Sequence, residues 1–211
     1  MTMALHSEPV VGVILAGGMA RRFGGVDKAS IVLGEKTLLE HAIMRARPQV
    51  SEMIINAAGQ AERFSAFGLP VVADVVDGFV GPLAGVLTGF EWARQNRPDV
   101  NWLASFAVDT PFMPDDVIER LTNAVKAEDA DIACARSDGR THPVFALWKT
   151  ELIDDLRHCL VDDEMRKVDF WTARHRVVHV NFETVPVDPF FNVNRQEDLA
   201  EAEQILAELS A

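Results

Sequence analysis

The order of apolar and polar positions along the first two thirds of the chain predicts an alternation of strands and helices. Short runs of consecutive apolar residues are typical of strands that are buried on both faces. Between these runs, apolar positions recur three and four residues apart, as in helices with one buried face. Such alternation predicts a doubly wound sheet of parallel strands. The expected strands span residues 10–15, 52–57, 69–73, 102–108 and 130–136, and the expected helices 37–46, 82–95 and 115–127.

The pattern changes after residue 136. Residues 142–149 form a further apolar run only a short turn away, which predicts a strand antiparallel to its predecessor. We therefore expect one α/β domain of three layers, α/β/α, with a Rossmann-like, mostly parallel sheet and an antiparallel strand. The remaining elements are expected at 151–160 (helix), 165–174 (helix), 175–182 (strand) and after residue 194, where Leu199, Ala202, Ile205, Leu206 and Leu209 form an apolar stripe.

The length of 211 residues is enough for one complete core. We assign this domain to residues 9–211, with an N-terminal half at about 9–136 and a C-terminal half at about 137–211. Residues 1–8 are expected to form a flexible tail, because they lack the cationic and apolar regions of a signal peptide.

Charge and cysteine content narrow the function further. The formal net charge is −12, from 20 basic and 32 acidic residues, which argues against nucleic acid or an anionic membrane as a partner. Cys134 and Cys159 have neither the spacing of a zinc site nor that of a disulfide framework. No apolar run reaches the ~18 residues of a membrane span. These features predict a cytoplasmic protein.

A glycine-rich, cationic stretch follows the first strand directly. Glycines remove the Cβ atoms that would keep an anion from backbone N–H groups, and nearby cations add attraction. The spacing fits neither the G-x-G-x-x-G fingerprint nor the P-loop, since Lys28 follows Asp27 and precedes Ala29. The alternative is a tight connection beside solvated arginines, but a turn needs only one or two glycines. We predict a phosphate-binding loop that contains Gly17, Gly18, Gly24, Gly25, Arg21, Arg22 and Lys28.

Polar residues end several of the expected parallel strands, where ligands collect in open α/β sheets. Asp109 is placed to hold Mg²⁺ on a nucleotide phosphate, although an aspartate before Thr110-Pro111 can also simply start a turn. Asn56 can read a base edge or cap its own loop. Asp74 ends a further strand, and the glycines at 81 and 85 allow close approach to the start of a helix, a weak anion site when taken alone.

Three sets of residues stand out in the second half. For His142, contact with an acceptor substrate or a structural placement is favoured over acid–base catalysis, because phosphoryl transfer needs little such help. Asn192 and Asn194 share one side of an extended segment and suit a polar heterocycle, while Asn194 can also cap the last helix. His175 and His179 would stand about 13 Å apart on one strand, so solvent exposure is expected rather than a metal site.

The glycine-rich loop resembles the L-A-G-G-x-x-x-R-x-G-G-x-D-K signature of nucleotidyltransferases that act on phosphorylated acceptors. It is most similar to the molybdenum cofactor guanylyltransferase family. G-P-L-A-G at residues 81–85, D-T-P-F at 109–112, His142-Pro143 and F-x-N-x-N at 190–194 follow in the family's order. The resemblance extends from Leu15 to Leu199. The chain departs from the family pattern at Arg195-Gln196, which leaves both amides in place.

This resemblance implies a nucleotide-diphospho-sugar transferase-like fold and transfer of GMP from GTP to the terminal phosphate of molybdopterin, with Mg²⁺ as the cofactor. The partners it implies are GTP, molybdopterin in the molybdenum cofactor, and a molybdoenzyme or its chaperone. The implied catalytic residues are Lys28, Arg22, Gly25 and Asp109, with Asp109 holding the metal. The implied nucleotide-binding residues are Leu15, Ala16, Gly17, Gly18, Lys28, Asn56, Asp74, Gly81, Gly85 and Asp109, and the acceptor-binding ones are His142, Asn192 and Asn194.

Two other functions stay open at this point. The same fold could use CTP or a sugar-phosphate acceptor, which nucleotide binding in the presence of magnesium would distinguish. A catalytically silent partner in molybdoenzyme maturation would bind GTP or cofactor without turnover. The presence of both Lys28 and Asp109 argues against a protein without catalytic activity, and release of pyrophosphate would decide the question.

Overall fold

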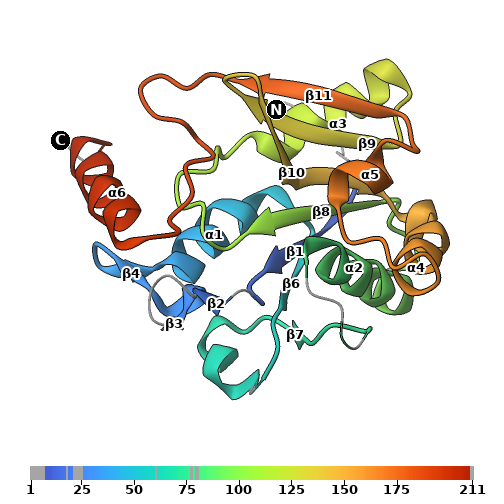
Figure 1. The fold of residues 1–211 in the computed structure, drawn as a ribbon, viewed down its shortest axis with the longest axis horizontal. Helices are drawn as coiled ribbons and strands as arrows, with labels where there is room; N and C mark the ends of the chain where they lie inside the picture. The colour runs from blue at the N-terminus through green and yellow to red at the C-terminus, as the bar shows by residue number, and fades with distance from the viewer. Residues whose placement is uncertain are drawn as a thin grey trace, which may run out of the picture.

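A seven-stranded sheet forms the centre of the computed structural model, which describes residues 8–17, 19–20, 26–59, 61–76, 78 and 81–209 (Figure 1). The predicted tail lies almost wholly outside the described residues. The strands of the sheet are β1 (Val10–Leu15), β6 (Glu52–Asn56), β7 (Val71–Val72), β8 (Trp102–Ala107), β9 (Ile132–Ser137), β10 (Arg140–Lys149) and β11 (Val177–Phe182). Their order across the sheet is β11-β9-β10-β8-β1-β6-β7.

The predicted mostly parallel sheet with an antiparallel strand is confirmed. Within this sheet, β10 pairs antiparallel with both of its neighbours, β8 and β9, and the other pairings are parallel. The sequence did not indicate that β10 inserts between β8 and β9. Its stretch from Phe145 to Trp148 is buried throughout, as expected of a strand in the middle of a sheet.

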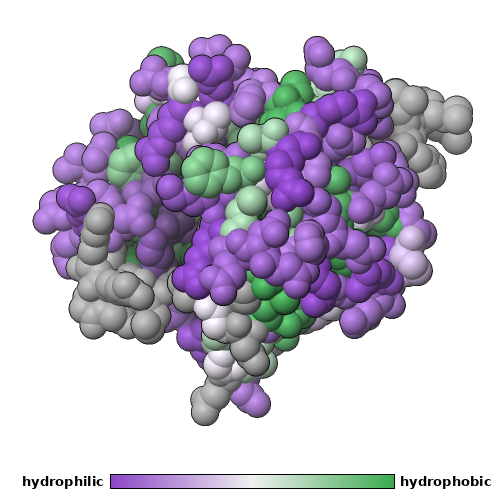
Figure 2. Space-filling view, turned by 45° about the vertical axis from the view of Figure 1, so that its right-hand side comes forward, coloured by the Kyte–Doolittle hydropathy of each residue, from purple (hydrophilic) through white to green (hydrophobic). Residues whose placement is uncertain are grey.

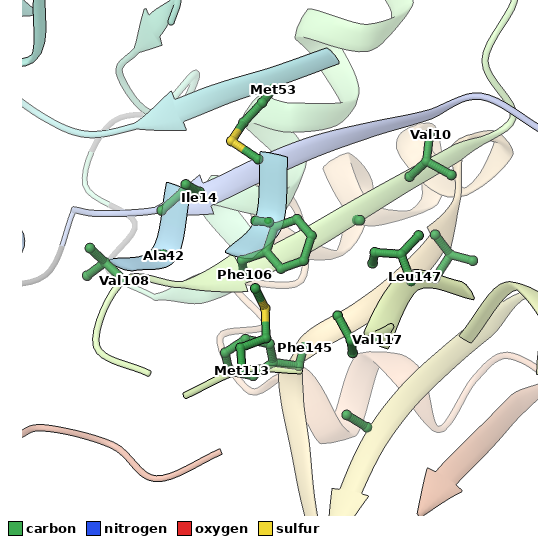
Figure 3. Close-up of a cluster of buried hydrophobic side chains, with 14 of the residues drawn as sticks. Val10, Ile14, Ala42, Met53, Phe106, Val108, Met113, Val117, Phe145 and Leu147 are labelled. Carbon is green, nitrogen blue, oxygen red and sulfur yellow. The ribbon is translucent and has the colours of Figure 1, made fainter. Parts of the chain in front are cut away.

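Helices cover both faces of the sheet and complete the three layers. One face is covered by α1 (Leu38–Ala46) and α3 (Val117–Glu128), which pack against apolar side chains of β1, β8 and β10 (Figure 3). The opposite face is covered by α2 (Pro82–Asn96), α4 (Ile153–Val161) and α5 (Val168–Thr172). Core side chains such as Phe106 and Trp148 are almost fully buried, so the two faces bury enough apolar surface to hold the layers together.

Local sequence explains where two of these helices begin. Thr37 caps α1: its hydroxyl accepts from the Glu40 amide at 3.2 Å, and the Glu40 carboxylate accepts from the Thr37 amide at 2.6 Å. This reciprocal capping box satisfies two amides that the helix leaves unpaired. In contrast, α3 begins at Val117, later than predicted, because residues 115 and 116 form a turn before it.

The C-terminal helix, α6 (Gln196–Leu209), lies apart from the sheet (Figure 1). It packs on a third apolar cluster that includes Leu33, Leu38 and Val193, the last fully buried. Its expected apolar stripe is confirmed except at Leu209, which is 49% exposed. The remaining elements are β2 (Met19–Ala20), β3 (Val26–Asp27), β4 (Val32–Leu33), β5 (Lys36–Thr37) and the 3₁₀ helices η2 (Lys28–Ser30), η3 (Arg47–Gln49), η4 (Ala61–Phe67) and η5 (Thr150–Leu152).

Three local predictions are wrong. The strand expected at 69–73 is only the two-residue β7, and the helix expected at 165–174 is only the five-residue α5. His175 is not solvent-exposed: its side chain is 13% exposed, contacts Trp171 edge-on and hydrogen bonds Asp155 across 3.2 Å. His179 is exposed, as expected.

The surface over α4 and α5 is mostly hydrophilic, with separate apolar patches (Figure 2). Phe170, on α5, is the most exposed aromatic side chain of the described residues, at 61%. Within the same residues, no helix combines the length and apolar character needed to cross a membrane. Cys134 and Cys159 are both buried and both free thiols; the sequence predicted no disulfide between them.

Candidate active site at the carboxyl ends of the strands

A cavity of about 390 Å³ opens at the carboxyl ends of β1, β6 and β8, which is large enough for a nucleotide-sized ligand. The parallel register brings the last residues of these strands, Leu15, Asn56 and Ala107, into one row. Loops that follow the strands then add the charged side chains. Of the described residues, the cavity is lined by Leu15, Gly17, Lys28, Asn56, Asp74, Gly81, Pro82, Ala107, Val108, Asp109 and Val144.

Most of the predicted nucleotide-binding residues are therefore gathered in one place. Gly18, Arg22 and Gly25 lie outside the described residues, as do Arg21 and Gly24. The flanking strands β2 and β3 pair antiparallel with each other. The role of the glycine-rich loop in phosphate binding stays a prediction.

Lys28 bridges two functional segments that are far apart in the sequence. Its ammonium nitrogen lies 2.6 Å from Asp109 Oδ2 and 2.5 Å from Asn194 Oδ1. The side chains of Lys28 and Asp109 are 17% and 16% exposed, so the ion pair is shielded on most sides but open to the cavity. A cation is thus held directly on the carboxylate that was predicted to bind a metal.

Lys28 owes its position to a local anchor that sequence reasoning missed. Asp27 Oδ1 accepts from the Ala29 amide and caps η2, at whose first residue Lys28 lies. Asp27 Oδ2 in turn pairs with Arg63 of η4 at 2.5 Å. No local motif marks Arg63, because the pairing depends on the return of the chain after β6.

Asn56 and Asp74 form the opposite wall of the cavity. Asn56 is 4% exposed, and its Nδ2 group donates to Val72 O at 3.2 Å and to Asp74 Oδ1 at 2.9 Å. Both partners are acceptors, which fixes the orientation of the amide. Gly85, at the start of α2, makes room for it: a Cβ there would lie only 2.4 Å from Asn56 Oδ1. These two bonds join the end of β6 to β7 and the residues after it, and they do not cap the loop that directly follows β6. Contact of Asn56 with a base stays a prediction.

The segment before α6 is tied directly to the end of β8. The Val193 amide donates to Asp109 O at 2.8 Å, and the Thr110 hydroxyl donates to Asn192 Oδ1 at 2.6 Å. The side chains of Asn192 and Asn194 bind Thr110 and Lys28, whereas Val193 is fully buried in the third apolar cluster. Asn194 does not cap α6 with its side chain; the carboxylate of Asp198 accepts from the Asn194 and Arg195 amides instead.

His142 lies beside the cavity but not in its lining. It is 6% exposed and stacks on Phe190 with ring centroids 4.5 Å apart. Ser137 Oγ donates to Asp188 Oδ1 at 3.0 Å and therefore accepts from His142 Nε2, 2.7 Å away. This chain joins the β9–β10 hairpin to the segment that carries the two asparagines, in agreement with a structural placement. Contact of His142 with an acceptor stays a prediction.

Burial gives His142 a testable pH dependence. Burial lowers the pKa of His142 below its ordinary value of 6.5, and Arg140 acts in the same direction while Asp188 opposes it. The unfolded chain therefore takes up this proton first as the pH falls below about 6.5, so the free energy of unfolding should decrease there. In the variant H142Q, urea denaturation at several pH values should show a smaller decrease. If the free energy of unfolding of H142Q decreases as much on acidification as that of the wild type, the prediction is wrong. H179Q, at an exposed position of β11, is the surface control.

Among the described residues, no group of three or more histidine, cysteine, aspartate or glutamate side chains is arranged to hold a metal ion. A metal at Asp109 would thus be held by at most two such side chains from this part of the chain. Mg²⁺ commonly binds through one or two carboxylates, water and substrate phosphates, so this donor set fits Mg²⁺ on a nucleotide better than a protein-enclosed metal.

Comparison with known proteins decides the family. Residues 12–177 match the MobA-like NTP transferase domain. A molybdenum cofactor guanylyltransferase from Bradyrhizobium sp. (strain ORS 278) is 52% identical over 94% of this chain and 93% of its own. The chain belongs to the molybdenum cofactor guanylyltransferase family. It is a nucleotidyltransferase, and its relative of the same name in Nitrobacter hamburgensis is 48% identical over 97% of this chain and 98% of its own.

Solved structures of this family and of related transferases share the fold. Molybdopterin-guanine dinucleotide biosynthesis protein A from Archaeoglobus fulgidus has a TM-score of 0.76 at 24% identity, over 94% of this chain and 99% of its own. 4-Diphosphocytidyl-2C-methyl-D-erythritol synthase from Anaerococcus prevotii has a TM-score of 0.72 at 14% identity, over 95% and 96% of the two chains. The expected nucleotide-diphospho-sugar transferase-like fold is therefore confirmed.

Proposed function

We propose that this protein transfers GMP from GTP to the terminal phosphate of molybdopterin, and so forms molybdopterin guanine dinucleotide and pyrophosphate. The observation that carries the proposal is that Lys28, Asp109 and the Asn56–Asp74 pair line one cavity at the carboxyl ends of the strands. The names and high identity of the curated relatives support the same assignment.

The phosphates of GTP are assigned to the cationic side of the cavity. Backbone N–H groups from Leu15 to Gly18 and the ammonium of Lys28 would hold the triphosphate, with Arg22 and Gly25 at its reacting end. An oxygen of the molybdopterin phosphate attacks the α-phosphorus and forms the new P–O bond. The bond from that phosphorus to the bridging oxygen breaks in line, and its electron pair leaves with pyrophosphate. The protein contributes position and charge, and it needs no nucleophile of its own.

Asp109 is the residue assigned to Mg²⁺. Its carboxylate faces the cavity and already binds a cation, the Lys28 ammonium, at 2.6 Å. When bound there with GTP, Mg²⁺ would neutralise charge that develops on the phosphate oxygens. Lys28 would then be released from Asp109 toward the phosphates while Asn194 continues to hold it.

The Asn56–Asp74 pair favours guanine among the bases. Both Nδ2 hydrogens of Asn56 are already used, on Val72 and Asp74, so its Oδ1 is what it can offer to a ligand. Asp74, when ionised, likewise offers acceptor oxygens. Guanine presents two neighbouring donors on one edge, N1–H and the 2-amino group, which complement two acceptors. Cytosine presents a single donor, its 4-amino group, beside an acceptor, which favours GTP over CTP.

The acceptor is assigned to the side of Asn192 and Asn194. Their Oδ1 atoms accept from Thr110 and Lys28, and within the described part of the chain their Nδ2 groups have no protein partner. These amide donors are therefore available to carbonyl and ring-nitrogen acceptors of a pterin. His142 supports this segment because it stacks on Phe190 and hydrogen bonds Ser137, which in turn donates to Asp188.

Incubation of the protein with magnesium, GTP and molybdenum-loaded molybdopterin tests this function directly. Mass analysis should find molybdopterin guanine dinucleotide, and one pyrophosphate should be released for each product molecule. Parallel reactions with CTP or with a sugar phosphate in place of molybdopterin should give little product. Binding of GTP without any pyrophosphate release would identify a silent maturation partner instead and would contradict the proposal.

A further inference from the structure

Thr88 lies inside α2, away from the cavity lining, and makes two hydrogen bonds with its hydroxyl. Its exposed fraction is 0%. The hydroxyl donates to Ala84 O at 2.9 Å, which is the ordinary bond of a threonine to the preceding helical turn. It also accepts from the Val75 amide at 3.2 Å. The second bond leaves the helix and reaches a loop thirteen residues earlier in the chain.

The loop that Thr88 reaches carries Asp74. Val75 is the next residue and is itself 40% exposed, so its apolar side chain does little to hold the loop in place. Asp74 is exposed too, and its carboxylate accepts a hydrogen bond from Asn56 Nδ2. A chain of contacts thus runs from Thr88 through the Val75 backbone to Asp74 and on to Asn56.

We propose that Thr88 is a positioning residue for base recognition: it fixes the backbone at Asp74 and so holds the Asp74 and Asn56 acceptors at the spacing of a guanine edge. This inference rests on the proposed function, since it assumes that those two residues read the base. Thr88 does not touch the nucleotide. Gly85, one turn earlier on the same helix, leaves space for the Asn56 side chain. The same part of α2 therefore makes room for Asn56 and, through Thr88, fixes the backbone beside Asp74.

Three variants separate positioning from a general structural role. T88V keeps the shape of the side chain but loses the hydroxyl, T88S keeps the hydroxyl, and T122V replaces another buried helical threonine, on α3 at the opposite face of the sheet. The readouts are calorimetric Kd values for GTP and for inosine triphosphate, which lacks the 2-amino group, and kcat at saturating GTP.

In T88V, the Kd for GTP should rise about fivefold, which corresponds to one hydrogen bond of ~1 kcal/mol. The preference for GTP over inosine triphosphate should shrink by a similar factor, while kcat at saturating GTP stays within about twofold. T88S should restore the wild-type values, and T122V should not differ from the wild type. A change in thermal stability would not by itself alter the ratio of the two Kd values, so this ratio distinguishes positioning from structure.

Two results would overturn the inference while leaving GTP as the substrate: wild-type Kd values in T88V, or a weaker Kd with an unchanged preference for GTP. A wild-type protein that does not bind GTP at all would instead overturn the proposed function. If T88V does not fold, hydrogen exchange on the wild type decides. The Val75 amide should be protected despite its exposed position, and exchange at the rate of an unstructured peptide would contradict the proposal.

Discussion

Replacing Asp109 with alanine should reduce turnover by roughly 10³-fold at saturating GTP and magnesium. Asp109 follows β8. Its side chain pairs with Lys28 and lines the cavity to which the reacting phosphates are assigned. Without it, Lys28 keeps Asn194 as its partner among the described residues, and the metal–nucleotide complex loses the carboxylate assigned to it. Steady-state pyrophosphate release measures the effect.

The fold should survive this substitution. The backbone carbonyl of Asp109, which accepts from Val193, is unchanged, and the lost side-chain contact is partly open to solvent. D115A, at an exposed position in the loop after β8, is the matched control and should keep wild-type turnover. Turnover of D109A within tenfold of the wild type, in a folded protein, would remove Asp109 from the mechanism.

Gly85→Ala should raise the KM for GTP at least tenfold. The new Cβ would lie 2.4 Å from Asn56 Oδ1 and 2.5 Å from Leu15 Cδ2, which is closer than any real contact, so both side chains must move. Both line the cavity. Because alanine stabilises a helix interior by up to about 1 kcal/mol relative to glycine, the helix gain offsets part of the packing cost, and activity should suffer more than stability.

Gly89, four residues later on α2, supplies the matched control. A Cβ there would meet Leu103 at 3.0 Å and Val13 at 3.1 Å, in the core and away from the cavity. G89A has the same gain in helix propensity and also crowds the core, though less severely, and it should leave the KM for GTP unchanged. Equal KM values for G85A and G89A would show that the space beside Asn56 is not needed for nucleotide binding.

Much of the fold could be predicted because its strands and helices have strong local patterns. β1 and β8 consist almost entirely of apolar residues, and α1 carries both an apolar stripe and a capping box. The insertion of β10 between β8 and β9 could not be predicted, because strand order depends on long-range pairing. The bonds of Asp155 with Trp171 and His175 could not be predicted either, because they form only when α4 and α5 meet.

The candidate site was predictable where residues follow strands directly. Asn56 and Asp109 stand at the ends of β6 and β8, and parallel pairing brings such positions together. The contacts that hold them were not predictable. Arg63 on Asp27 and Thr88 on Val75 connect segments whose spacing carries no motif. Thr88 lies among the buried apolar residues of α2, so the sequence alone indicates no role for it beyond packing in the core.

The central claim is that this cavity binds the guanine nucleotide, with its phosphates between Lys28 and Asp109. A crystal structure of the protein with magnesium and a non-hydrolysable GTP analogue tests this claim most directly. In that structure, guanine should contact Asn56 and Asp74, and a magnesium ion should join Asp109 to the phosphates. A nucleotide bound elsewhere, or a base that points away from Asn56 and Asp74, would contradict it.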